Sequence, residues 1–219
     1  MAEEQGMSMD QLEFMKRMKA IASDLWGGNS APEEAAPAKK PREEAGPKAA
    51  PKPAIGINNL WKTADETIDW TDALAHNTPT DGLTSPKLWS FYHKNAAKVL
   101  EGDLDAYTEV LQRSNPLGEL TDFAEGINMR AVSADRLEST FTCKESCMGK
   151  NKKQYLSAMG LRIARDLLAC LPVSEVAVTG EMDGETVFSV TYTRQQLLHR
   201  NFVFIDPVAL SEECGAVYY

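Results

Sequence analysis

The sequence predicts an α+β fold, in which a helical N-terminal half precedes a small, mostly antiparallel sheet covered by one long helix. Two observations predict it. Apolar residues recur every three to four positions over 57–127, which is typical of helices. From residue 128 apolar and polar residues alternate in two pairs of strands, on either side of a helical stretch at 151–171. Such runs of strands favour an antiparallel sheet in the order β-β-α-β-β-α-β.

Residues 1–27 carry the clearest helical pattern of the chain. Asp10 is a favourable N-cap residue, and Glu13 follows it at the spacing of a capping box. Gly27 and Gly28 end the helix. One face is apolar, and it carries the residues that we expect to bind a partner: Phe14, Met18, Ile21, Leu25 and Trp26.

Residues 28–56 have the composition of a disordered linker. Ala, Pro, Lys and Glu dominate, no aromatic residue occurs, and the one large aliphatic residue is Ile55. Such a segment buries too little apolar surface to offset the entropy that ordering costs. We therefore predict an amphipathic helix over 1–27, a linker over 28–56 and a single α+β domain over 57–219.

Capping signals divide the first part of this domain, residues 57–127, into helices. Thr63 and Glu66 have the spacing of a capping box, which predicts a helix starting there. Ser85 and Pro86 combine an N-cap residue with a proline in the first turn, which marks the start of a second helix. A third helix is expected after Asp103.

The second part, residues 128–219, contains the predicted sheet. The first hairpin turns at Ala134 and Asp135, and the second has Asp183 and Gly184 at its tip. A last strand is predicted at Phe202–Ile205, where aromatic and β-branched residues follow one another.

The long helix predicted at 151–171 is the expected centre of the core. Pro172 ends it. Arg162 and Arg165 can point outward from it, and Asp166 lies nearer the edge of its apolar face. That face is broad and consists of Tyr155, Leu156, Met159, Ile163, Leu167 and Cys170.

The charge of the chain is concentrated in the helical part. Of the net charge of −9, residues 57–128 contribute most, with twelve acidic and five basic residues, whereas residues 129–219 hold eleven and ten. This distribution indicates a solvated helical face or, alternatively, an acidic docking surface for a basic partner. Acidity argues against nucleic acid and against an anionic membrane as partners, because both require a dense basic face.

No apolar stretch is long enough to span a bilayer, and the first residues lack the pattern of a secretory signal. Because the sequence shows no export signal, we expect the four cysteines to be reduced thiols and the protein to be cytoplasmic. Cys143 and Cys147 have a spacing that zinc sites use, and Cys170 and Cys214 could complete four ligands. Because a second closely spaced pair is missing, we expect buried thiols, no metal and no cofactor.

Two functional hypotheses follow. The first is a cytoplasmic, non-enzymatic interaction or adaptor protein, in which the tethered helix binds a protein partner or a second copy of the chain. The second is a hydrolase or nuclease that uses carboxylates, assisted by Lys150, Lys152 or Lys153. Its candidate carboxylates are Asp135, Glu138, Glu181, Asp183 and Asp206. The sequence contains no phosphate-binding loop.

Overall fold

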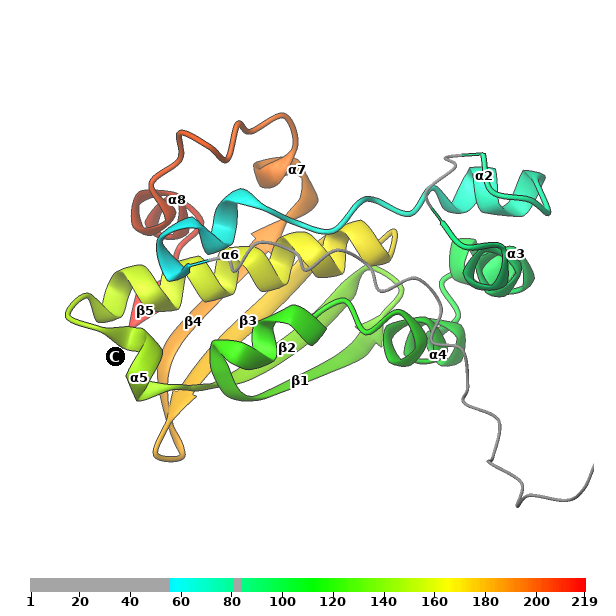
Figure 1. The fold of residues 1–219 in the computed structure, drawn as a ribbon. Coiled ribbons are helices and arrows are strands. Elements are labelled where there is room, and N and C mark those ends of the chain that lie inside the picture. Colours follow the sequence, from blue (N-terminus) through cyan, green and yellow to red (C-terminus); the bar gives the residue numbers. More distant parts are fainter. Residues whose placement is uncertain (1–55, 81–83) are drawn as a thin grey trace, which may run out of the picture. The chain divides into compact units, whose positions relative to one another are not determined.

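The computed structural model describes residues 56–80 and 84–219, in which helices pack on a mixed five-stranded sheet (Figure 1). The predicted α+β class is confirmed. The elements, in chain order, are η1 (Ile57–Lys62), α2 (Trp70–Ala75), α3 (Pro86–Leu100), α4 (Leu104–Ser114), η2 (Gly118–Asp122), β1 (Ala124–Ser133), β2 (Arg136–Cys143), α5 (Glu145–Met148), α6 (Lys152–Cys170), β3 (Glu175–Met182), β4 (Glu185–Thr193), α7 (Arg194–Leu197), α8 (Pro207–Glu213) and β5 (Val217–Tyr218).

The sheet has the strand order β1-β2-β3-β4-β5. β1 pairs with β2, β3 with β4 and β4 with β5, all antiparallel, whereas β2 and β3 are parallel. A parallel pair needs a crossover connection, and α6 supplies it, because it carries the chain from the end of β2 back to the start of β3. The sheet is therefore mixed.

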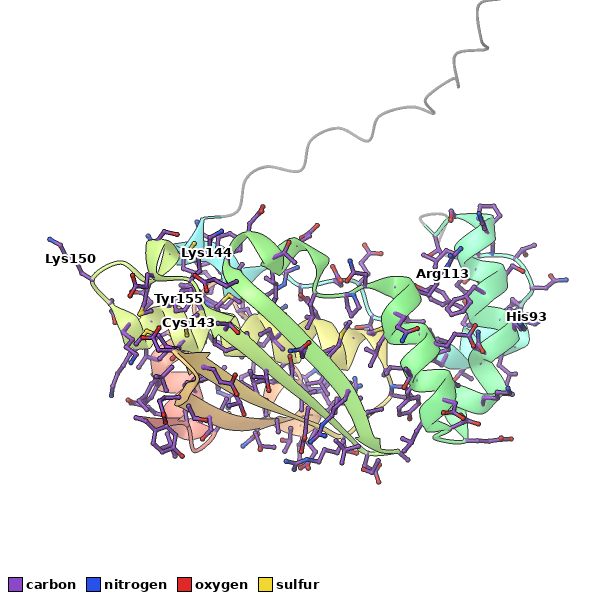
Figure 2. All side chains as sticks on the ribbon, turned by 90° about the horizontal axis from the view of Figure 1, so that it is seen from below. His93, Arg113, Cys143, Lys144, Lys150 and Tyr155 are labelled. Carbon is purple, nitrogen blue, oxygen red and sulfur yellow. The ribbon has the colours of Figure 1, made fainter. Side chains whose placement is uncertain are left out.

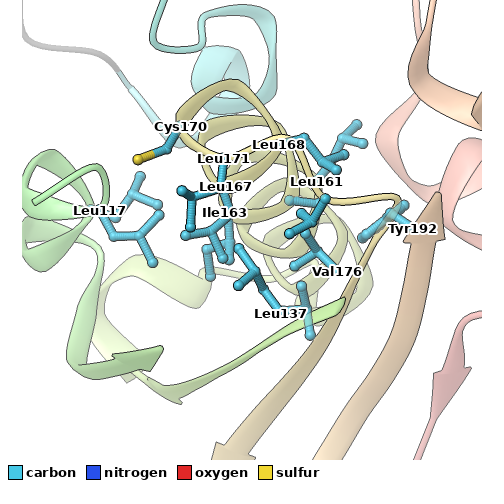
Figure 3. Packing of buried hydrophobic residues seen from close by; sticks show 14 of the residues in the cluster. Leu117, Leu137, Leu161, Ile163, Leu167, Leu168, Cys170, Leu171, Val176 and Tyr192 are labelled. Atoms are coloured by element: carbon cyan, nitrogen blue, oxygen red, sulfur yellow. The ribbon is translucent and has the colours of Figure 1, made fainter. Parts of the chain in front are cut away.

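The core lies between this sheet and α6 (Figure 3). Alternate residues of β2 and β3 face the helix, among them Leu137 and Val176, and they meet Ile163 and Leu167, all of them fully buried. The packing is close at Gly160, where a Cβ atom would lie 2.7 Å from the Phe188 ring. Glycine is needed there because any side chain would force the ring to shift.

The outer side of α6 is covered as well, by the extended segment and short helix of residues 57–69, which we call the strap (Figure 1). Because α8 also packs against α6, fifteen of its nineteen residues are buried. The expectation that Arg162 and Arg165 point outward to solvent is wrong for Arg162, which is 2% exposed, and Asp166 is completely buried. Arg165 also bonds to the strap.

Two predicted elements differ from the structure. Residues 202–205 form a turn instead of a strand, because the Phe204 N–H bonds to the Asn201 carbonyl and the Phe202 ring stacks on Arg165. The fifth strand is the short β5 near the C-terminus. The capping box at Thr63 and Glu66 starts no helix, because residues 63–69 are extended along α6. Asp69 caps α2 in its place.

Candidate binding pocket

A cavity of about 460 Å³ lies between the strap, α2, α3 and the C-terminal ends of α4 and α6. We call it the acidic pocket. Its walls combine aromatic rings with hydroxyl and carboxyl groups, the mixture that ligand sites in proteins use. The carboxyl groups belong to Asp65, Glu66, Asp69 and Asp72, and the hydroxyl groups include those of Thr67, Thr80 and Ser114.

Aromatic side chains hold the apolar wall of the acidic pocket in place. The indole of Trp89 donates to the His76 carbonyl at 2.9 Å, and the indole of Trp70 donates to the Cys170 carbonyl at 3.0 Å. Tyr92 packs edge-on against Trp70, with ring centres 5.4 Å apart. Because each ring is anchored to another element, the wall is built before any ligand arrives.

The charge in the acidic pocket is of one sign. Among the described residues that line it, none is Lys, Arg or His. Asp72 lies 2.7 Å from the His76 Nδ1 atom and accepts a hydrogen bond from Thr80. Asp69 accepts from two backbone N–H groups at the start of α2. Four acidic residues therefore line one hollow; local hydrogen bonds orient Asp69 and Asp72, and Asp65 lies 3.8 Å from the Arg162 guanidinium.

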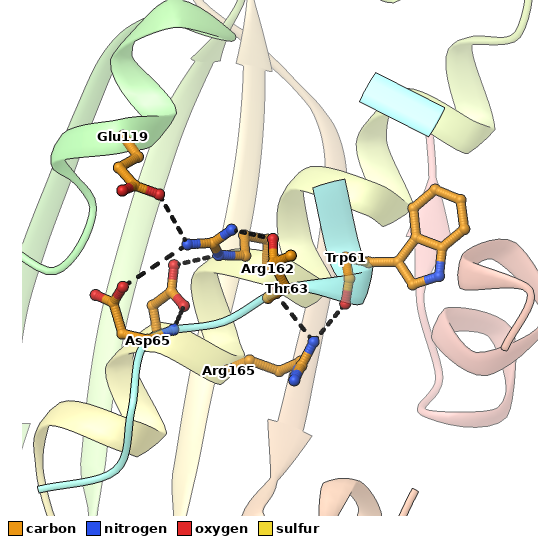
Figure 4. Close-up of polar contacts among 7 residues, drawn as sticks. Trp61, Thr63, Asp65, Glu119, Arg162 and Arg165 are labelled. Atoms are coloured by element: carbon orange, nitrogen blue, oxygen red, sulfur yellow. Dashed lines mark hydrogen bonds and ion pairs between the residues drawn. The ribbon is translucent and has the colours of Figure 1, made fainter. Parts of the chain in front are cut away.

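The strap, which forms one wall of the acidic pocket, is held on α6 by a polar network around Arg162 (Figure 4). Arg162 donates to Asp166 at 2.6 Å and to the Thr63 hydroxyl at 2.7 Å. Its guanidinium also lies 3.4 Å from Glu119 and 3.8 Å from Asp65. One buried cation thus gathers three carboxylates from the strap, η2 and α6.

The same network fixes the backbone of the strap. Asp166 accepts a hydrogen bond from the Asp65 N–H at 2.9 Å, and Arg165 donates to the carbonyls of Trp61 and Thr63 (Figure 4). Burial raises the pKa of Asp166 to about 7, although the charge of Arg162 opposes this shift. The position of the pocket wall therefore depends on a buried carboxyl group whose charge is costly.

Sequence reasoning missed this network because each of its members looks like an ordinary surface charge. Arg162 and Asp166 are four residues apart on one helix, a spacing that solvent-exposed ion pairs also use. The one available signal was the polar interruption of a helix that is otherwise apolar on most sides.

The predicted partner-binding residues, Phe14, Met18, Ile21, Leu25 and Trp26, lie outside the described residues. The same is true of nearly all of the predicted linker, residues 28–56, of which only Gly56 is described.

The carboxylates proposed for a hydrolytic site do not come together. Glu138 is opposite Ala177 in the sheet, and Glu181 follows four residues later on β3, which is about 13 Å along a strand. Asp206 caps α8, where it accepts from the Val208 N–H at 2.8 Å. Asp183 lies at the tip of the β3–β4 hairpin, far from Asp135 at the β1–β2 turn.

Of the predicted basic assistants Lys150, Lys152 and Lys153, Lys153 pairs with Glu212, a carboxylate outside this set, at 3.3 Å and lies over the Tyr218 ring. Lys150 points away from the body at the loop before α6 (Figure 2). Glu138 pairs instead with Arg130, whose hydrogen bond lowers the pKa of that carboxyl. Lys153 and Glu138 are thus engaged in separate local contacts.

The four cysteines are free thiols, and Cys143 and Cys170 are buried as expected, whereas Cys147 and Cys214 are partly exposed, contrary to that expectation. Burial raises the pKa of Cys143 to about 11 and that of Cys170 to about 12, so both thiols keep their protons. Cys143 lies beside Lys144 and Tyr155 at one end of the body, whereas His93 lies at the opposite end (Figure 2). A Cys–His pair is therefore not formed by these two residues.

Within residues 56–80 and 84–219, no group of three or more His, Cys, Asp or Glu side chains is arranged to hold a metal ion. No helix in this described part of the chain is long and apolar enough to cross a membrane. Comparison with family models, with curated protein sequences and with solved structures gave no match for the chain.

Proposed function

We propose that the protein is a non-enzymatic interaction protein, whose domain binds a cationic side chain of a partner protein in the acidic pocket. The observation that carries this proposal is the composition of that pocket, in which four carboxyl groups and two anchored aromatic rings face one hollow. A lysine or arginine side chain fits this chemistry, because its charge interacts with carboxylates and its stem and head group pack on aromatic rings.

The chemistry of the pocket supports binding rather than bond cleavage. Its thiol, Cys170, keeps its proton because burial raises its pKa to about 12. Asp69 and Asp72 are occupied by hydrogen bonds within the domain. These groups are suited to orienting a cation, whereas a nucleophile would need an activating base beside it.

The tethered helix predicted at residues 1–27 is the second part of this proposal. Its apolar residues Phe14, Met18, Ile21, Leu25 and Trp26 would insert into a groove of a partner. Two weak contacts joined by a flexible linker bind more tightly than either alone, since the second forms at a high effective concentration. A cytoplasmic location is part of the proposal and rests on the sequence.

Binding of a cationic peptide to the full chain tests the pocket. The probe is a labelled peptide of Lys and Gly, and its twin carries Gln at each Lys. We expect Glu66→Gln with Asp72→Asn to weaken binding of the Lys peptide by about tenfold, in line with the loss of two neighbouring charges. Fluorescence anisotropy measures this change.

The matched control makes the same change of charge elsewhere. Glu101→Gln with Glu109→Gln removes two exposed carboxylates at the end of α3 and on α4, away from the acidic pocket. Equal weakening by both double variants would mean that only the overall charge attracts the peptide, and the proposed pocket would then be wrong.

A further inference from the structure

We propose a second docking surface, of opposite charge, on the other side of the strap: a groove that binds an acidic amphipathic segment of a partner protein. We call it the arginine groove. It lies between residues 64–67 of the strap and the chain from α7 to residue 202, and has a volume of about 290 Å³. Leu168 and Ala169 of α6 also line it.

The groove is electropositive in a domain that is acidic as a whole. Residues 57–219 hold twenty-three acidic and fifteen basic residues. The lining of the groove reverses this balance, since it contains Arg165, Arg194, Arg200 and a single carboxylate, Asp65. Arg200 pairs with Glu213 at 2.5 Å, outside the lining, so the excess of positive charge rests on Arg165 and Arg194. This local excess of positive charge is complementary to Asp and Glu side chains.

Two of these arginines bond to carbonyl oxygens, which satisfy their N–H groups but leave their formal charge in place. Arg194 donates to the carbonyls of Val173, Leu168 and Leu171 at the end of α6, at distances between 2.7 and 2.9 Å. Arg165 donates to carbonyls of the strap. Their side chains are thereby fixed in position, so that a carboxylate would meet preorganised cations.

The rim of the groove exposes apolar side chains that the domain itself does not cover. Leu198 lines the groove and is 51% exposed, and Phe202, which also lines it, is followed in the chain by the exposed Val203 and Phe204, the latter 85% exposed. Exposed apolar side chains at the edge of a hollow favour an interaction surface. A neighbouring hollow shares Thr67, Leu168, Ala169 and Arg194 with the groove and is lined further by Asp69, Leu100, Leu171 and Pro172.

These features together define the ligand. An amphipathic segment would place apolar side chains on Leu198 and the neighbouring turn, and carboxylates beside Arg194. A basic segment would meet repulsion from Arg165 and Arg194. The strap thus separates a hollow that favours cations from one that favours anions.

The probe for the test is a labelled helical peptide of Leu and Glu, about 18 residues long so that it can become helical on docking. Anisotropy is measured with the full chain at low salt. We expect saturable binding that weakens by about tenfold in Leu198→Glu and in Phe204→Ser. Both residues are more than half exposed, so neither change opens a cavity.

Three controls make the outcome decisive. Leu104→Glu changes another exposed leucine, on α4, and should leave binding unchanged. The pocket variant Glu66→Gln with Asp72→Asn should also leave binding of the acidic peptide unchanged, so that failure here and failure of the acidic pocket can be told apart. Binding that is absent, or that Leu198→Glu and Phe204→Ser do not weaken, overturns the proposal; so does equal weakening by Leu104→Glu.

Discussion

The two sides of α6 are buried by different means. Toward the sheet, Ile163 and Leu167 pack among apolar residues of β2 and β3 (Figure 3). Toward the strap, Arg162 and Asp166 are buried just as deeply, but they are held by ion pairs and hydrogen bonds (Figure 4). Equal burial on the two sides therefore has different energetic origins. The first side is stabilised by removal of apolar surface from water, and on the second side pairing of the charges offsets the cost of burying them.

The largest effect is expected from breaking the charged side. Arg162→Leu would leave Asp166 buried without its cation and would remove the hydrogen bond to Thr63. We expect the free energy of unfolding to fall by about 3–5 kcal/mol, the usual result of removing one partner of a buried pair. Urea denaturation measures this free energy of unfolding. A decrease below about 1 kcal/mol would show that the network contributes little to stability.

A similar or slightly smaller loss is expected on the apolar side. Ile163→Ala or Leu167→Ala leaves a cavity between α6 and the sheet and should cost about 2–5 kcal/mol in urea denaturation. This change should not alter the dependence of stability on pH, because both residues are uncharged. A pH-dependent loss in either variant would contradict the separation of the two sides.

The apolar side of α6 could be predicted from the sequence, and the charged side could not. The stripe through Ile163 and Leu167 has helical spacing, and the alternation in β2 and β3 supplies its partner face. Arg162 carries no such signal, because its partners Thr63 and Glu119 are 99 and 43 residues away. Pairing over such distances depends on the tertiary fold.

Dependence on the tertiary fold also explains why the helix predicted in the strap and the last predicted strand do not form. A capping box at Thr63 favours a helix locally, but bonds from Arg162 and Arg165 hold this segment extended along α6. The aromatic run at 202–205 favours a strand, yet the Ile205 carbonyl accepts a hydrogen bond from Trp61 and not from a neighbouring strand. The acidic pocket could not be predicted from the sequence for the same reason, because the strap is one of its walls.

The smallest effect on stability is expected from changes in the helix predicted at residues 1–27. Met18→Glu with Ile21→Glu disrupts the predicted apolar face, and if this helix serves a partner, the melting temperature of the domain stays nearly unchanged while partner binding is lost. Differential scanning calorimetry measures the melting temperature. A marked destabilisation would show that the helix belongs to the core of its own domain.

The contrast between the two sides is tested most directly by unfolding the wild type and Asp166→Asn in urea at about pH 5 and about pH 8. Burial raises the folded-state pKa of Asp166 to about 7, whereas an unfolded aspartate has a pKa of about 3.9. The folded state therefore binds a proton more tightly, and the stability from this proton, fully present below the unfolded pKa, is lost as the pH rises through the folded pKa.

We therefore expect the stability of the wild type, relative to Asp166→Asn, to fall between about pH 5 and about pH 8. Ile163→Ala serves as the control, since its difference from the wild type should be the same at both values. A stability difference between the wild type and Asp166→Asn that does not change with pH would contradict a buried, charge-sensitive contact between α6 and the strap.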